Sequence, residues 1–235
     1  MLKAIILSID GIITDLSHFH FLAWKSIYSL QGIEFNAKDW QHLKGLSRSD
    51  VVKSFNQKSK TNLTLDQMNK IFDDKNLLFI KLIKEGLKPS HLINGAKQLI
   101  DEAKNKGLKV IIISQSSNAL LEIKSLGLAK KVDYVTNLHA KGLQALSDDE
   151  KEHFSTIQYA FKELGLVGHE CIGFGNRIGT INQYKAYGVY TVGIANYENE
   201  REIKKIADYS VDMPEQVNFD EIVFNYYIQD DKKSN

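Results

Sequence analysis

Two side chains that could do chemistry stand just beyond an apolar run near the start of the chain. Residues 3–15 read KAIILSIDGIITD, and Ser8 and Asp10 follow the run at residues 4–7. A serine hydroxyl is protonated at neutral pH and needs a neighbouring base to attack, and a carboxylate is a poor base for an alcohol. A buried strand that ends here places both side chains at its carboxyl end, where ligands bind in open parallel sheets. An Asp-Gly pair also ends many strands only because glycine permits the turn.

A second polar stretch follows a later apolar run, in IIISQSSNA at residues 111–119. Ser114 would end that strand, and Ser116 and Asn118 stand where the next helix would begin. Free backbone N–H groups and the helix dipole favour an anion at such a point, so phosphate is a candidate ligand. The alternative is that Ser116, Ser117 or Asn118 only caps the helix.

The elements that position these side chains alternate between strand and helix over most of the chain. Apolar runs predict strands near 3–8, 108–114, 132–136, 170–175, 189–194 and 209–211, and helices at 96–105, 118–126, 154–164, 178–186, 198–206 and 215–228, with a frayed charged tail at 229–235. Between residues 16 and 87 we expect only helices, at 18–31, 36–44, 49–55 and 64–84.

Strand–helix alternation of this length means parallel pairing with right-handed crossovers. We therefore expect an α/β fold with a doubly wound parallel (Rossmann-like) core. Residues 1–15 plus 88–235 would form this core domain. Residues 16–87 would form a helical cap domain inserted after the first strand.

The composition excludes several classes of protein. The 235 residues are 43% hydrophobic and 25% charged, which is typical of a soluble globular chain. The net charge of +1 gives no support for a nucleic-acid or anionic-membrane partner. The single cysteine, Cys171, cannot form an intrachain disulfide, and we find neither a signal segment nor an apolar run long enough to span a bilayer. We expect a cytoplasmic protein, and the sequence leaves its oligomeric state open.

Three stretches together resemble one family. KAIILSIDGIITD at 3–15, HFHFLAWK at 18–25 and LKGLSR at 43–48 are similar in order and spacing to the β-phosphoglucomutase branch of the haloacid dehalogenase superfamily, and the resemblance covers nearly the whole chain. Those enzymes open with a strand that ends D-x-D-G. The resemblance implies that the first acid is a nucleophile that becomes an aspartyl-phosphate and the second a general acid/base. Here Ser8 stands at the nucleophile position, where we expect it to be inactive, and Asp10 stands at the acid/base position.

The phosphate contacts of the family match two further stretches. By the resemblance, Ser114 and Asn118 would contact a phosphate, together with a lysine that opens a K-P-x-P stretch in the family. Counting back from Gly165 places this lysine at Lys151, in DDEKEHF. The prolines are absent here and the preceding loop is longer than usual, so an ordinary solvated lysine is the alternative.

The last catalytic motif of the family, E-D-S-x-x-G-I, is replaced by IGFGNRIGTI in this chain. Gly175 and Asn176 stand at the metal positions where the two acids should be. Magnesium prefers hard, anionic oxygen ligands, and of the family's four carboxylates only Asp10 remains. We therefore expect no tight metal site and no cofactor. Arg177 adds positive charge in a form suited to phosphate, so Ser114, Asn118, Lys151 and Arg177 would hold an anion without a metal.

The predicted cap keeps the stretches with which β-phosphoglucomutases close over glucose phosphates. By the resemblance, His20 would help to position the acid/base and Arg48 would reach the distal phosphate. Trp24 would otherwise be core packing, and Arg48 and Lys75 would otherwise lie on a solvated face. Leu16 and Val51 depart from the family, which uses a hinge threonine and a polar residue there. The full set of matching cap residues is His20, Trp24, Lys44, Gly45, Ser47, Arg48, Lys75 and Asn76.

The sequence thus predicts a β-phosphoglucomutase-like protein that has lost phosphoryl transfer. It would bind a phosphorylated small molecule such as a sugar phosphate, an inorganic anion, or a protein partner. Two alternatives stay open. One is an active β-phosphoglucomutase or sugar-phosphate phosphatase, which would need Mg²⁺. The other is a purely structural or interaction module.

Overall fold

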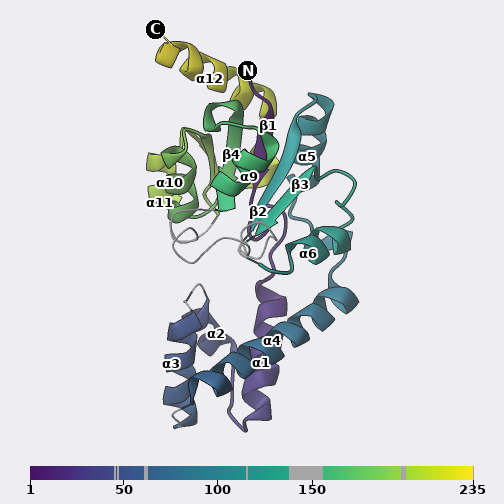
Figure 1. Ribbon diagram of the computed structural model, residues 1–235, viewed down its shortest axis with the longest axis vertical. Helices are drawn as coiled ribbons and strands as arrows, with labels where there is room; N and C mark the ends of the chain where they lie inside the picture. Colours follow the sequence, from purple (N-terminus) through teal and green to yellow (C-terminus); the bar gives the residue numbers. More distant parts are fainter. Residues whose placement is uncertain are drawn as a thin grey trace. The chain divides into compact units, whose positions relative to one another are not determined.

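The computed structural model describes residues 1–44, 46, 48–60, 63–114, 116–137, 156–196 and 200–234 (Figure 1). The chain forms two compact units, one of Met1–Asp15 with Lys88–Asn235 and the other of Leu16–Leu87. These ranges are also those that we expect from the sequence for a core and an inserted cap. That the smaller unit closes over a ligand stays a prediction.

The larger unit contains a parallel sheet, which confirms the predicted doubly wound fold. Within the described residues its strands lie in the order β3-β2-β1-β4-β5-β6. Their bounds are Ala4–Leu7 (β1), Lys109–Ser114 (β2), Tyr134–Asn137 (β3), Cys171–Gly175 (β4), Tyr190–Ile194 (β5) and Tyr209–Val211 (β6). The strand order reverses direction between β1 and β4, and ligands bind outside the carboxyl ends of strands at such a switch point.

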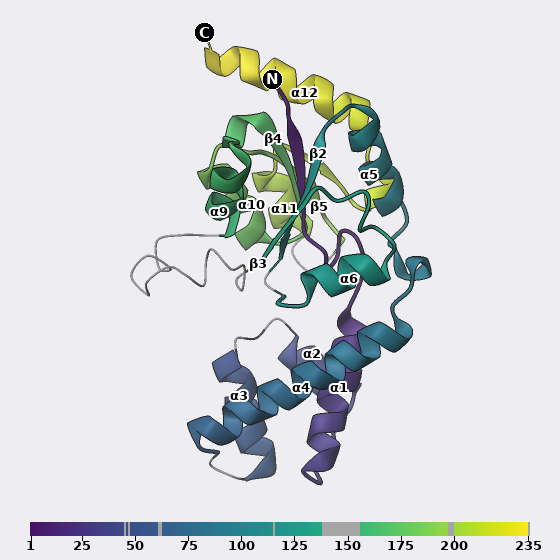
Figure 2. The same cartoon turned by 45° about the vertical axis from the view of Figure 1, so that its right-hand side comes forward.

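The central strands are apolar on both faces because helices cover both. All of β1, AIIL, is buried, as is all of β4, CIGFG. One face packs Ile6 and Ile111 against Ile157 of α9 and Tyr184 of α10. Figure 2 shows α9 and α10 on one side of the sheet and α5 on the other. The described residues of this unit form the helices α5 (Ala96–Asn105), α6 (Ala119–Ser125), α9 (Thr156–Leu164), α10 (Ile178–Ala186), α11 (Glu200–Ile206) and α12 (Phe219–Ser234), with short 3-10 turns at Pro89–His91 (η1), Gly168–Glu170 (η2) and Pro214–Gln216 (η3).

The smaller unit is a helical bundle with a core of its own. It contains α1 (Ser17–Leu30), α2 (Ala37–Leu43), α3 (Arg48–Ser59) and α4 (Leu65–Gly86). Reciprocal capping boxes begin two of these helices, with Asn36 before α2 and Thr64 before α4. The buried side chains of this core are Trp24, Ile27, Tyr28, Phe35, Leu43, Val51 and Phe55. Val51 therefore packs inside the bundle, which explains an apolar residue at that position.

The end of the chain differs from the sequence-based expectation. A helix at 215–228 followed by a frayed tail is wrong, because α12 begins at Phe219 and continues to Ser234. Pro214 opens a separate 3-10 turn, and the Asn218 side chain then accepts a hydrogen bond from the Glu221 N–H, as an N-cap does. Farther along, Gln229 donates to the Asp208 carboxylate at 3.3 Å, which ties the last turns to the core.

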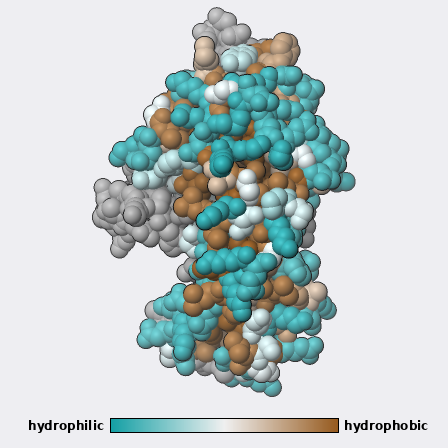
Figure 3. All heavy atoms as spheres, turned by 90° about the vertical axis from the view of Figure 1, so that its right-hand side faces the viewer, coloured by the Kyte–Doolittle hydropathy of each residue, from teal (hydrophilic) through white to brown (hydrophobic). Residues whose placement is uncertain are grey.

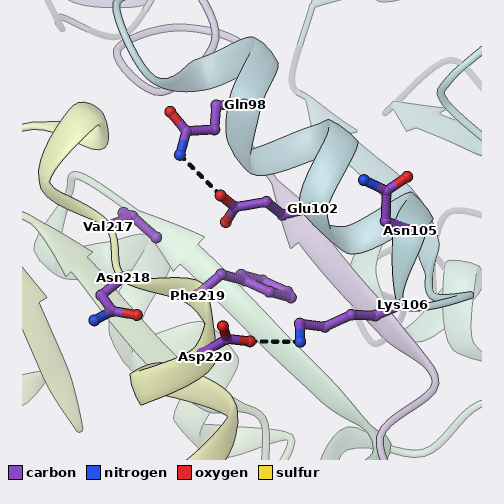
Figure 4. A pocket seen from close by; sticks show the side chains of 8 residues that line it. All are labelled: Gln98, Glu102, Asn105, Lys106, Val217, Asn218, Phe219 and Asp220. Atoms are coloured by element: carbon purple, nitrogen blue, oxygen red, sulfur yellow. Dashed lines mark hydrogen bonds and ion pairs between the residues drawn. The ribbon is translucent and has the colours of Figure 1, made fainter.

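The exterior is mixed, and Figure 3 shows hydrophilic residues over much of the face drawn, with apolar patches between them. Among the described residues, no helix combines the length and apolar character needed to cross a membrane. A hollow of about 590 Å³ lies between α5 and the start of α12 (Figure 4). Across it, Lys106 and Asp220 form an ion pair of 2.5 Å. Because Lys106 precedes β2, this hollow lies toward the amino ends of the strands, away from the edge where ligands bind in such sheets.

Candidate functional site

Three neighbouring strand ends bring the predicted core residues to one edge of the sheet. Leu7 pairs with Ile112 on one side and with Phe174 on the other. Ser8 follows Leu7 directly, Ser114 ends β2, and Gly175 ends β4. Asp10 comes three residues after the end of β1 and Asn176 one residue after the end of β4, so the five residues share the carboxyl edge of β2, β1 and β4.

Ser8 lies against a tyrosine rather than against a base. Its Oγ is buried and has no hydrogen-bond partner by distance and angle among the described residues. The nearby Tyr184 side chain is 1% exposed; burial raises the pKa of its hydroxyl, and the Ser8 side chain acts to lower it. Gly173 makes room for this ring, because a Cβ there would lie 2.6 Å from Tyr184 Cδ2. Among the described residues, therefore, no base accepts a hydrogen bond from the Ser8 hydroxyl.

Asp10 faces a cation supplied by the chain. The Arg177 Nη2 lies 3.6 Å from the Asp10 Oδ2, and the two side chains are 57% and 37% exposed. The turn that carries Asp10 is fixed by several hydrogen bonds. The Gly11 N–H donates to the Thr14 carbonyl at 2.7 Å, and the Asn196 side chain donates to the Gly11 carbonyl at 3.2 Å. Asp10 is therefore held on a rigid turn, whereas Arg177 reaches it from the start of α10.

The loop after β2 corrects one expectation. The sequence suggests free backbone N–H groups for an anion, but the Ser116 N–H donates to Ser114 Oγ at 3.0 Å and the Asn118 N–H donates to Ser116 Oγ at 3.1 Å. The Ser116 side chain thus forms a turn that precedes α6, whereas the N-cap residue of α6, Asn118, makes no side-chain capping hydrogen bond. Two N–H groups are thus satisfied by side chains. Among the described residues the Ser114 hydroxyl makes this hydrogen bond alone, as an acceptor, so its O–H can donate to a ligand.

Sequence reasoning missed two side chains of this edge. Glu122 is 1% exposed, and its Oε1 accepts a hydrogen bond from Ser116 Oγ at 2.7 Å. Asn196, just after β5, holds the Gly11 carbonyl. A glutamate in a helix is normally exposed, so nothing in LLEIK pointed to Glu122. A polar residue two positions after the end of β5 was the only signal for Asn196.

The smaller unit brings three of its predicted site residues together. Lys75 Nζ lies 2.8 Å from His20 Nδ1, and it lies 5.8 Å from the centre of the Trp24 ring. Because an ammonium group only donates, Nδ1 of His20 is the acceptor and its ring is neutral in this contact. The His20 ring stacks on Phe79 with 4.2 Å between centroids. Trp24 is 7% exposed, which confirms core packing for it, whereas Lys75 is half-buried against aromatic rings rather than on a solvated face.

The remaining predicted residues divide into two groups. Lys44 follows α2 and Asn76 lies in α4, both half-buried. Gly45, Ser47 and Lys151 lie outside the described residues, as does the side chain of Arg48. Their contact with a ligand stays a prediction.

The chain belongs to the haloacid dehalogenase-like hydrolase family, because the model of that family matches residues 2–182. Within the family it lies in the β-phosphoglucomutase-like branch. The β-phosphoglucomutase of Bacillus subtilis (strain 168) is 28% identical to it over 195 residues, which are 82% of this chain and 83% of that protein.

Solved structures agree with this placement. A β-phosphoglucomutase from Clostridium difficile is similar with a TM-score of 0.76 and 25% identity, over 97% of this chain and 99% of that one. CbbY from Rhodobacter sphaeroides, solved in complex with phosphate, shares the fold with a TM-score of 0.70 and 17% identity, over 93% of this chain and 97% of its own.

At the positions where the family resemblance predicts metal ligands, the side chains are not the set that Mg²⁺ prefers. The side chains there are a serine hydroxyl at Ser8, a carboxylate at Asp10 that already faces Arg177, no side chain at Gly175, and an amide at Asn176. Mg²⁺ prefers anionic oxygen ligands in near-octahedral geometry. In the part of the chain that the structure describes, no three or more His, Cys, Asp or Glu side chains form a cluster that could hold a metal ion.

Proposed function

We propose that this protein binds a phosphorylated small molecule, such as a sugar phosphate, at the carboxyl ends of β1, β2 and β4 without transferring the phosphoryl group. One observation carries the proposal. The single carboxylate kept from the family's set, on Asp10, faces the guanidinium of Arg177 at 3.6 Å. A positive side chain thus lies where an active relative would need acids and a metal.

The loss of phosphoryl transfer follows from what the reaction requires. In-line transfer needs a nucleophile, a group that neutralises the phosphoryl charge, and an acid/base for the alcohol. Among the described residues no base is hydrogen-bonded to the Ser8 hydroxyl, and the donors at the predicted metal positions are not those that Mg²⁺ prefers. Of the family's catalytic carboxylates, the described residues at the matching positions retain Asp10, the predicted acid/base.

Binding of an anion is supported by the groups that remain. The Ser114 O–H is free to donate, and Arg177 offers a planar guanidinium suited to forked phosphate contacts. We propose that Asn118 and Lys151 complete the site. The loss of family carboxylates at positions 8, 175 and 176 removes repulsion that would otherwise oppose a phosphate dianion.

The ligand class is proposed from the family branch and from the smaller unit. The Bacillus subtilis relative is a β-phosphoglucomutase, and the smaller unit of this chain brings together His20 and Lys75, which the family resemblance places at the substrate. The second candidate is an active β-phosphoglucomutase or sugar-phosphate phosphatase, which the 28% identity favours.

A thermal-shift titration tests the proposed binding. With EDTA present, phosphate, sulfate and sugar phosphates at about 100 times their Kd are expected to raise the Tm by roughly 5–10 °C, because a ligand that binds only the folded state stabilises it by about 2.7 kcal/mol. Sodium chloride at matched ionic strength is the control and should leave the Tm unchanged. If none of these anions shifts the Tm without a metal, the proposal is wrong.

A further inference from the structure

The pairing of Asp10 with Arg177 has a second consequence, which rests on the proposed function. An anion that enters this edge of the sheet meets a guanidinium that is already engaged by a carboxylate of the same chain. We infer that Asp10 acts as an internal competitor of the bound anion, and that Arg177 exchanges Asp10 for the phosphate group. In this role Asp10 is a positioning residue and no longer an acid/base.

The geometry suits such an exchange. The distance of 3.6 Å is that of an ion pair, longer than a charge-assisted hydrogen bond, and both side chains are more than a third exposed. Exposed pairs of this kind contribute little to stability. Phosphate can accept two parallel N–H bonds from one guanidinium, which is a stronger interaction. Arg177 can therefore leave Asp10 with little loss.

The helix that begins after Arg177 supplies no second carboxylate that would bind its guanidinium. It stands at the N-cap of α10 in an extended conformation, and the first turn of that helix contains no acidic residue. The next residue but one, Gly179, leaves open space where a side chain would otherwise stand. The backbone that carries Asp10, in contrast, is held by hydrogen bonds at Gly11, so the carboxylate can move only by rotation of its short side chain. The two partners thus separate when Arg177 turns.

The inference predicts opposite effects for the two partners. Asp10→Asn removes the competing carboxylate and keeps the shape, so phosphate should bind at least threefold more tightly. Arg177→Gln removes the cation, so phosphate should bind at least tenfold more weakly. With Arg177 replaced, the added Asp10→Asn change should have a smaller effect than it has alone, because coupled residues are not additive. A merely structural role for either residue would not give opposite signs.

The experiment is a calorimetric titration of the full chain with inorganic phosphate and with sulfate, in EDTA and again in Mg²⁺, at constant ionic strength. Arg201→Gln is the matched control, because Arg201 is an exposed arginine of α11 in the same unit and should bind as the wild type does. Circular dichroism verifies that each variant is folded.

The possible outcomes distinguish a failure of the proposed anion binding from a failure of the proposed exchange of Asp10 for phosphate. A wild type that binds no anion overturns the proposed function and this inference with it. A wild type that binds phosphate while Asp10→Asn weakens binding, or while Arg177→Gln matches Arg201→Gln, overturns only the inference. Binding by the wild type that requires Mg²⁺ also contradicts it, because the guanidinium would then not replace the metal as the counter-charge.

Discussion

Replacing Gly173 by alanine is expected to lower the free energy of unfolding by about 3 kcal/mol or more. The added Cβ would lie 2.6 Å from Cδ2 and 2.9 Å from Cε2 of Tyr184, closer than real Cβ atoms approach other atoms. The ring cannot move aside, because Tyr184 is buried between β4 and α10 with Ile6 and Val189 in the same cluster. Either the ring or the strand must shift.

A glycine-to-alanine change at an open position of the next helix serves as the control. It adds the same methyl group without the steric clash with Tyr184. At Gly179, in the first turn of α10, an added Cβ meets nothing within 4 Å. Gly179→Ala should therefore be neutral or raise stability by up to about 1 kcal/mol, because alanine favours helix over glycine. Urea unfolding measures both variants. Equal stabilities for Gly173→Ala and Gly179→Ala would contradict the packing described here, whereas recovery in Gly173→Ala/Tyr184→Leu would support it.

The second large effect is expected from restoring the acids of the family. The variant Ser8→Asp/Gly175→Glu/Asn176→Asp places three carboxylates beside Asp10, and without a metal their repulsion should lower the Tm. Mg²⁺ should then raise the Tm of the variant by several degrees and leave the wild type unchanged, since a metal stabilises only a chain that binds it. Adding Arg177→Ser, which supplies the family residue, should enlarge the magnesium response by removing the guanidinium next to Asp10.

Close packing around Gly175 is expected to make the restored variant less stable, apart from any charge repulsion. A Cβ at Gly175 would lie 3.0 Å from Thr180 Cγ2 and 3.1 Å from Ile181 Cδ1, so these side-chain ends must move by a few tenths of an ångström. We expect a loss of about 1–3 kcal/mol from this overpacking. Gly175→Ala alone measures it, and serves as the control for the restored variant. If Mg²⁺ raises the Tm of the wild type and of the restored variant equally, the lost-metal interpretation is wrong.

The sheet could be predicted from the sequence because its signals are local. Runs such as AIIL and VIII give buried strands, and the alternation with helices gives parallel pairing with crossovers. The last helix could not be placed correctly because its start depends on how Pro214 and Asn218 divide the chain into a 3-10 turn and a separate helix. Its last turns depend on the contact between Gln229 and Asp208, far apart in the sequence.

The sequence predicted residues that lie at the candidate site, but it did not predict which of their side chains contact one another. That Ser8, Asp10 and Ser114 share one edge follows from strand order alone. The contact of Arg177 with Asp10 joins residues 167 positions apart, and no local pattern shows which carboxylate a guanidinium will face. The burial of Glu122 is likewise invisible in a helix pattern, because it depends on a serine hydroxyl in the preceding loop.

Turnover is the measurement that tests the central claim most directly. The pure protein is incubated with β-glucose 1-phosphate, Mg²⁺ and a trace of glucose 1,6-bisphosphate, and glucose 6-phosphate and free phosphate are followed at several protein concentrations. We predict rates at background throughout, because in the described part of the chain no base is hydrogen-bonded to the Ser8 hydroxyl and the proposed metal positions lack the acids that Mg²⁺ prefers. Turnover that scales with protein and disappears both in Asp10→Ala and in EDTA would contradict the account.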